Sequence, residues 1–305
     1  VINELDSDTP STDDKEFVEL KSAIPNYPLD GYVLVFFNGN PSSSTANKSY
    51  FAIDLDGLTT DANGIILIGN SLVSPAPDKL FSDNIIQNGA DGVGLYLGNA
   101  TDFPEDTLAT TTNLIHALMY DTNDADATAL MTLLGVLTQY DENQNNLQAT
   151  QSVQRKRDGT YEAKNPTPGA NNDGSGIVFN GITITTNTAN KNEGDSFIIT
   201  FTTQTNVTSD LIFNFTLNKS SFNTSDFTGN TTVSIPSGSN TFATTITITD
   251  DAFDEGDEVL NIKFGTIPSQ YKRLNDNIEI QVVDNAFPIA SFGTPLNPTY
   301  GTVSS

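Results

Sequence analysis

The chain has 305 residues, which is long enough for two domains that each bury a hydrophobic core. It carries 13 basic and 38 acidic residues, a net charge of −25, so we expect no nucleic-acid binding through this region and no affinity for anionic membranes. With no cysteine and a single histidine, the sequence excludes disulfides, zinc sites and cysteine nucleophiles.

No run approaches the roughly 18 apolar residues that a membrane span needs, so no membrane insertion is expected. Thr, Asn, Ser and Asp are abundant, while Lys, Arg and Met are scarce, which favours an all-β fold. The chain starts at Val1 rather than at Met, so we expect that a signal peptide has been removed and that the protein is secreted or lies at the cell surface.

Short apolar runs bounded by turn residues predict strands through the first 171 residues. Two of them flank an acidic loop near the start of the chain, and Phe17 and Leu20 belong to the second. The other expected strands are GYVLVFFNG (31–39), YFAIDLDG (50–57), GIILIGN (64–70), GVGLYLGNA (92–100) and LIHALMYD (114–121).

One short helix is predicted after these strands. Asp124 or Asp126 is expected at its N-cap, and Gly135 is expected at the C-cap. The apolar residues of the helix are Leu130, Met131, Leu133 and Leu134. The later run TQSVQRKRDG (150–159) reads as a strand and a turn rather than as a binding patch.

Two features of this first region could serve in catalysis or in metal binding. His116 is the only histidine, so it is the only base available to a Ser-His-Asp triad, but it lies in an apolar strand and we expect it to be structural. Acidic loops could bind a cation, although caps and solvated turns are the favoured interpretation; their residues are Asp6, Asp8, Asp13, Asp14, Glu16, Asp121, Asp124 and Asp126.

Residues 172–176 are predicted to be a linker, and alternating apolar positions predict a second β-sandwich over 177–287. Within it the run DDAFDEGDE (250–258) has six acidic residues and no base, and it connects two predicted strands. Oxygen ligands without His or Cys suit a hard cation, calcium above all. A solvated acidic turn is the alternative, and charge density alone does not separate the two.

The first region resembles the bacterial lamin-tail domain, an immunoglobulin-like sandwich, over about 1–171. The segments that carry the resemblance are INELDSDTPSTDDKEFVEL, LDGYVLVFFNG, IQNGADGVGLY, LIHALMYDTNDADATALMTLLG, SVQR and PTPGANN. The resemblance implies an accessory module and no catalytic residue.

The second region resembles a Calx-β domain over about 176–287, through Glu193-Gly194-Asp195, Ser225-Asp226-Phe227, the DDxxxEGxE run and the closing Val283-Asp284-Asn285. The family binds calcium in a β-sandwich. Carried over by position, the resemblance implies the calcium ligands Glu193, Asp226, Asp250, Asp251, Glu255, Glu258 and Asp284.

The tail, 288–305, resembles the segment that precedes the catalytic domain of secreted bacterial proteins of the endonuclease I family. We therefore expect two immunoglobulin-like β-sandwiches joined by a short linker, acting as a non-catalytic, calcium-binding spacer of a secreted or cell-surface bacterial protein. One alternative is the N-terminal part of a secreted DNase, with its nuclease activity beyond Ser305. The other is a surface adhesin or structural protein, for which the Bacteroidetes type IX secretion route is the candidate for export.

Overall fold

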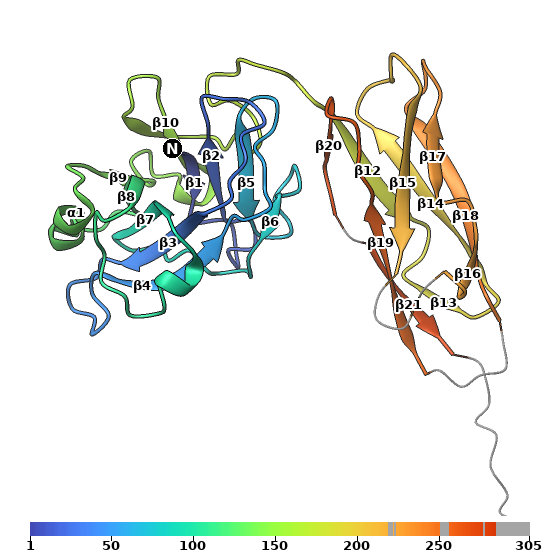
Figure 1. Cartoon of the computed structure of the whole chain (residues 1–305), viewed down its shortest axis with the longest axis horizontal. Helices are drawn as coiled ribbons and strands as arrows, with labels where there is room; N and C mark the ends of the chain where they lie inside the picture. The colour runs from blue at the N-terminus through green and yellow to red at the C-terminus, as the bar shows by residue number, and fades with distance from the viewer. Residues whose placement is uncertain (219–221, 223, 251–255, 277, 285–305) are drawn as a thin grey trace, which may run out of the picture.

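The computed structural model describes residues 1–218, 222, 224–250, 256–276 and 278–284. It consists of two β-sandwiches that lie side by side along the long axis of the molecule, with the linker crossing between them at one end (Figure 1). The expected all-β fold with one short helix in the first half is confirmed.

Two sheets form the first sandwich. One sheet has the strand order β11-β10-β1-β2-β5-β6, with the N-terminal strands β1 and β2 at its centre. The other sheet has the order β4-β3-β7-β8-β9. The strands are β1 (Ile2–Asp6), β2 (Phe17–Lys21), β3 (Tyr32–Asn38), β4 (Lys48–Asp54), β5 (Ile65–Gly69), β6 (Lys79–Leu80), β7 (Asp91–Leu97), β8 (Leu114–Asp121), β9 (Gln139–Asp141), β10 (Ser152–Arg155) and β11 (Tyr161–Lys164).

A core of alternating apolar side chains from both sheets fills the first sandwich; Leu5 and Val18 come from one sheet, and Phe36 and Leu118 from the other. The opposite face of the second sheet is covered by the helix α1 (Thr128–Leu134) and by the 3-10 turn η1 (Ala100–Asp102). A second 3-10 turn, η2 (Gln148–Thr150), precedes β10. Because both faces of β3 are covered, its near-continuous apolar run is buried throughout its centre.

The expected N-cap of the helix was wrong. The N-cap is Ala127, which cannot cap with its side chain, and Asp126 instead accepts the Thr128 N–H at its backbone carbonyl, 2.9 Å away. Ala127 is buried, and its own N–H donates to the Gln139 side chain at 2.9 Å, so tertiary contacts position the start of the helix. The C-cap is Gly135 as expected, at φ 68° and ψ 27°.

The second sandwich also has two sheets, ordered β16-β18-β14-β12-β20 and β13-β21-β19-β15-β17. Its strands are β12 (Asn180–Thr186), β13 (Asn190–Asn192), β14 (Ser196–Thr203), β15 (Leu211–Leu217), β16 (Phe227–Gly229), β17 (Thr232–Ile235), β18 (Thr241–Ile248), β19 (Glu258–Phe264), β20 (Tyr271–Arg273) and β21 (Ile278–Val283).

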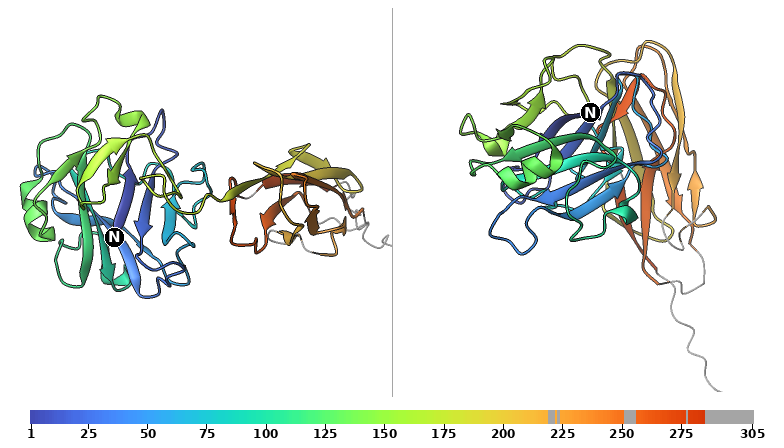
Figure 2. Two further views of the ribbon diagram at one scale, coloured as in Figure 1. Left: turned by 90° about the horizontal axis from the view of Figure 1, so that it is seen from above. Right: turned by 60° about the vertical axis from the view of Figure 1, so that its left-hand side comes forward.

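Strict alternation in β14 and β15 sends every second residue into one core between these sheets. Phe201 lies at its centre, with ring centroids 5.5 Å from Phe213, 5.1 Å from Phe215 and 5.6 Å from Phe264. The start of β12 and the whole of β20 lie at the end of this sandwich that is beside the first sandwich. The end of β21 lies at the opposite end (Figures 1 and 2).

Among the described residues, no helix combines the length and the apolar character that crossing a membrane would require.

Candidate metal site and the junction between the sandwiches

Five of the seven expected calcium ligands lie among the described residues, and all five lie where loops meet at the far end of the second sandwich. We call this region the acidic corner; its described residues are Glu193, Asp226, Asp250, Glu258 and Asp284. The other two expected ligands, Asp251 and Glu255, lie outside the described residues.

Three of the five line one small cavity. Glu193, Asp226 and Glu258 surround a space of about 10 Å³, closed on its apolar side by Phe222, Ile248 and Val282. A space of this size is close to the smallest that holds one water molecule. Each of the three carboxylate side chains is partly buried, so the cavity brings negative charge from three separate loops against an apolar wall.

Backbone contacts fix these three residues relative to one another. The Glu193 N–H donates to the carbonyl oxygen of Val283 at 3.2 Å, which ties the loop before β14 to the end of β21. The Asp226 carbonyl accepts the Thr249 N–H at 2.9 Å, which ties the start of β16 to the end of β18. Glu258 begins β19 and pairs with Val282 across the sheet.

The remaining two carboxylates approach the same corner from its rim. Gly194 has φ 79°, and a Cβ added there would lie 3.3 Å from the Asp250 Cβ, so a glycine is needed for this close approach. Asp284 accepts the Gly256 N–H at its Oδ2, 2.7 Å away, and so connects the end of β21 to the described end of the acidic run.

The donor set fits a hard cation in kind, because every side chain in it offers carboxylate oxygens. In the part of the chain that the structure describes, no three or more His, Cys, Asp or Glu side chains have the mutual spacing of a metal-ligand cluster. The carboxylates would therefore have to turn toward a shared point to coordinate calcium. The ligand set stays a prediction.

Three of the candidate acidic residues of the first sandwich accept hydrogen bonds from backbone N–H groups. Asp13 accepts the Thr9 N–H at 2.7 Å, and Asp121 accepts the N–H groups of Asn123 and Asp124 at 2.8 and 3.0 Å. Glu16 is fully buried and accepts the N–H groups of two successive residues, 85 and 86. Burial raises the pKa of Glu16 to about 8. These contacts are those of turns and caps.

His116 is part of the structure of the first sandwich. Its Nδ1 accepts the Ile2 N–H at 3.4 Å, so it joins β8 to β1 across the two sheets. Burial, the chain's amino terminus and Arg155 lower the pKa of His116 to about 4, which keeps the imidazole neutral at physiological pH.

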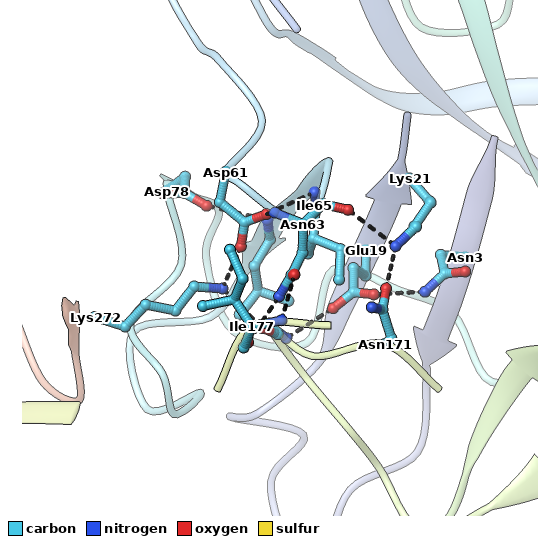
Figure 3. A network of polar contacts seen from close by, with 12 residues as sticks. Asn3, Glu19, Lys21, Asp61, Asn63, Ile65, Asp78, Asn171, Ile177 and Lys272 are labelled. Carbon is cyan, nitrogen blue, oxygen red and sulfur yellow. Dashed lines mark hydrogen bonds and ion pairs between the residues drawn. The ribbon is translucent and has the colours of Figure 1, made fainter. Parts of the chain in front are cut away.

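At the other end of the second sandwich, Lys272 connects the two halves of the molecule. Its ammonium lies 2.7 Å from the Asp61 Oδ2 (Figure 3). It also donates to the Gly169 carbonyl at 2.7 Å and lies 4.6 Å from the centre of the Phe179 ring. Both partners of the ion pair are only about one-fifth exposed (21% and 19%). One side chain of β20 therefore holds a loop of the first sandwich and the segment leading to the linker.

Backbone contacts around Lys272 extend this junction. The Ala76 N–H donates to the Arg273 carbonyl at 2.8 Å, and Ser74 donates to the Leu274 carbonyl at 3.1 Å. Asn63 exchanges two hydrogen bonds with the backbone of Ile177, at 2.8 and 3.0 Å. We call these contacts, together with those of Lys272, the junction.

Two fully buried glutamates hold the segment that enters the junction, 166–172, against the first sandwich. Glu4 accepts the N–H and the hydroxyl of Thr167 at 2.8 and 2.7 Å, and Glu19 accepts the Gly169 N–H at 2.7 Å. Burial is the main cause that raises the pKa of both carboxyls. Of the expected linker, Asn172 donates to the carbonyls of Asn3 and Arg155, so it too is tied to the first sandwich.

The junction was not predicted from the sequence. A signal was present, because Lys272 and Arg273 are adjacent bases in a chain with only 13 of them. The partners of Lys272, however, are a loop aspartate and a backbone carbonyl of the first sandwich, which no spacing along the sequence brings together. The Arg273 side chain pairs with Asp276 of its own sandwich.

No protein-family model matches this chain, and no curated protein matches it. Among solved structures, it is similar to the apo form of the Calx CBD1 domain, at 15% identity, over 34% of this chain and 97% of that chain, with a TM-score of 0.29. It is also similar to the calcium-binding domain CBD12 of CALX1.1, at 15% identity, over 34% of this chain and 44% of that chain, with a TM-score of 0.28.

A third solved structure is a type II cohesin dyad from the adaptor ScaA scaffoldin of Acetivibrio cellulolyticus, at 10% identity, over 94% of this chain and 99% of that chain, with a TM-score of 0.27. Because these identities are 15% or lower and the TM-scores are 0.29 or lower, the similarities do not assign a function, and the function has to be inferred from the residues of this chain.

Proposed function

We propose that this chain is a non-catalytic, calcium-binding spacer in which the acidic corner of the second sandwich binds the cation. The observation that carries the proposal is the cavity shared by Glu193, Asp226 and Glu258, which gathers carboxylates from three loops. The Calx-β resemblance in the sequence implies the same three residues as ligands. One of the solved structures to which this chain is similar, CBD12 of CALX1.1, is described as a calcium-binding domain.

The role of calcium in this proposal is structural. When bound, the ion supplies positive charge that offsets the repulsion among the carboxylates. Glu193, Asp226 and Glu258 would hold it, and Asp284 would order the end of the acidic run through its contact with the Gly256 N–H. Since these residues belong to the loops around β14, β16, β19 and β21, binding would restrain both sheets at one end.

Calorimetry of the purified chain tests the proposal directly. Calcium added to chelator-treated protein is expected to raise the melting temperature of the second sandwich, by mass action on the folded state. Glu258→Gln keeps the size of the side chain and removes one charge, so it is expected to weaken calcium binding and shrink the shift. Glu105→Gln is the matched control, because Glu105 is an exposed carboxylate of the first sandwich.

An unchanged melting temperature at millimolar calcium would remove the ion from the proposed function. A shift that survives in Glu258→Gln and in Asp226→Asn would place the bound ion elsewhere in the chain.

We further propose that the protein is secreted or lies at a bacterial cell surface, where calcium is abundant. The support is the net charge of −25 and the absence of cysteine. The association with a nuclease depends on the resemblance of residues 288–305, which lie outside the described residues. Fractionation of the native host, together with the reading frame that follows Ser305, distinguishes a DNase from an adhesin.

A further inference from the structure

Five basic side chains line one pocket of the first sandwich, at the end of the sheet that contains β1, β2, β10 and β11. The pocket has a volume of about 420 Å³. We call it the basic pocket; its cationic residues are Lys21, Arg155, Lys156, Arg157 and Lys164. They are five of the chain's 13 bases, so the concentration of positive charge stands out in a chain with 38 acids.

The acids of the pocket form an ion pair with only one of these cations. Glu162 forms its ion pair with Lys164, at 2.5 Å. Asp173 accepts the Ser175 N–H at 3.0 Å. Hydrogen bonds from Ser175 are the main cause that lowers the pKa of Asp173, and the charge of Lys21 lowers it further, although the two residues form no ion pair.

Four cations remain without an ion pair to any carboxylate of the described residues: Lys21, Arg155, Lys156 and Arg157. Lys21 donates to neutral oxygens only, the Asn63 carbonyl at 2.9 Å and the Asn171 side chain (Figure 3). The Arg155 Nε is buried and has no hydrogen-bond partner within the described part of the chain.

The hairpin turn between β10 and β11 positions three of these cations. The Lys156 N–H donates to the Thr160 carbonyl at 2.7 Å, and Gly159, at φ 92°, completes the turn. Asp158, the acid inside the turn, accepts the N–H and the hydroxyl of Thr160 at 2.9 and 2.7 Å. The Asp158 carboxylate is therefore bound within the turn. Arg155, Lys156 and Arg157 line the pocket.

Close like charges repel, and an anion that binds among them relieves that repulsion while it gains charge-assisted hydrogen bonds. Guanidinium groups match the geometry of phosphate, sulfate and carboxylate oxygens. The rest of the protein is strongly acidic, so a long polyanion would be repelled wherever it left the pocket. A compact ligand avoids this repulsion.

We propose that the basic pocket is a binding site for a compact, multiply charged oxyanion. Asn171, Asn172 and Ser175 also line the pocket, and they belong to the segment between the two sandwiches. The ligand would therefore lie between the β10–β11 turn and the start of the linker, beside Lys21, which donates to the Asn171 side chain.

Titration calorimetry of the whole chain tests the proposal, with pyrophosphate, sulfate and citrate as separate probes in a low-salt buffer. At least one is expected to bind at a single site, and the tightest of the three identifies the source as a phosphate, a sulfate or a polycarboxylate. The double substitution Lys156→Gln and Arg157→Gln is expected to weaken binding by about tenfold or more, because hydrogen bonds between charged groups are among the stronger ones.

Both substituted residues lie in the turn, so the melting temperature is expected to stay unchanged. The matched control removes two exposed cations elsewhere, Lys15→Gln and Lys263→Gln, and is expected to keep the affinity of the parent chain. Two results would overturn the proposal. One is the absence of binding by all three anions at millimolar concentration. The other is equal weakening in both double variants, which would mean that the anions respond only to net charge.

Discussion

Replacing Lys272 by alanine is expected to loosen the junction without unfolding either sandwich. The substitution removes an ion pair with Asp61, a hydrogen bond to the Gly169 carbonyl and a contact with the Phe179 ring. A hydrogen bond from a charged donor contributes about 1.5–3 kcal/mol, and a cation over a ring about 0.5–1 kcal/mol. Partial exposure and side-chain entropy reduce the sum, which leaves a net loss of about 2 kcal/mol.

A loss of about 2 kcal/mol lowers the ratio of docked to undocked molecules about 30-fold. Because the chain has no cysteine, spin labels can be placed at two introduced cysteines, Thr101→Cys in the first sandwich and Thr245→Cys in the second. The distance distribution between them is expected to broaden in Lys272→Ala. Lys263→Ala removes an exposed lysine of β19 and serves as the control.

The opposite result would refute the reasoning. If Lys272→Ala gave the same narrow distribution as the parent chain, the backbone contacts of Ser74, Ala76 and Asn63 would be sufficient, and the ion pair would have no part in orienting the sandwiches.

Three further predictions concern stability. The pKa of Glu16 is about 8 in the folded chain, above the usual value of 4.5. The contribution of Glu16 to stability is therefore full below pH 4.5 and is lost as the pH rises through 8. Glu16→Gln should flatten this part of the curve of melting temperature against pH. Phe201→Ala should cost about 3–5 kcal/mol in the denaturant unfolding of the second sandwich, because Phe201 is fully buried among three other phenylalanines. Gly135→Ala should cost about 1 kcal/mol in the unfolding of the first sandwich, because φ is 68° there; no cost would mean that the helix end adjusts.

Much of the fold could be predicted because strands leave a period of two in the sequence. Phe197, Ile199 and Phe201 occupy every second position, and the structure buries all three while leaving Ile198 between them exposed. The helix boundary could not be predicted in the same way. Aspartates at 124 and 126 are good N-caps by type, but a glutamine from β9 fixes the start of the helix at Ala127.

The candidate metal site was predictable only in part. The sequence motifs single out Glu193, Asp226 and Glu258, and the structure brings these three to one cavity. The run 150–159 was interpreted as a strand and a turn rather than as a binding patch, and β10 with its turn to β11 has that secondary structure. The full concentration of charge appears only when Lys21, which is far from the turn in the sequence, joins it in the folded chain.

The position of β12 and β21 has a mechanical consequence. The chain enters the second sandwich beside the first one, at Asn180, and β21 ends at Val283 on the far side (Figure 1). A tensile force applied between these two points would act along the strands. The hydrogen bonds between neighbouring strands would then be loaded in shear. Such a module lengthens an assembly in one direction, by roughly 26 Å for a strand of eight residues such as β14.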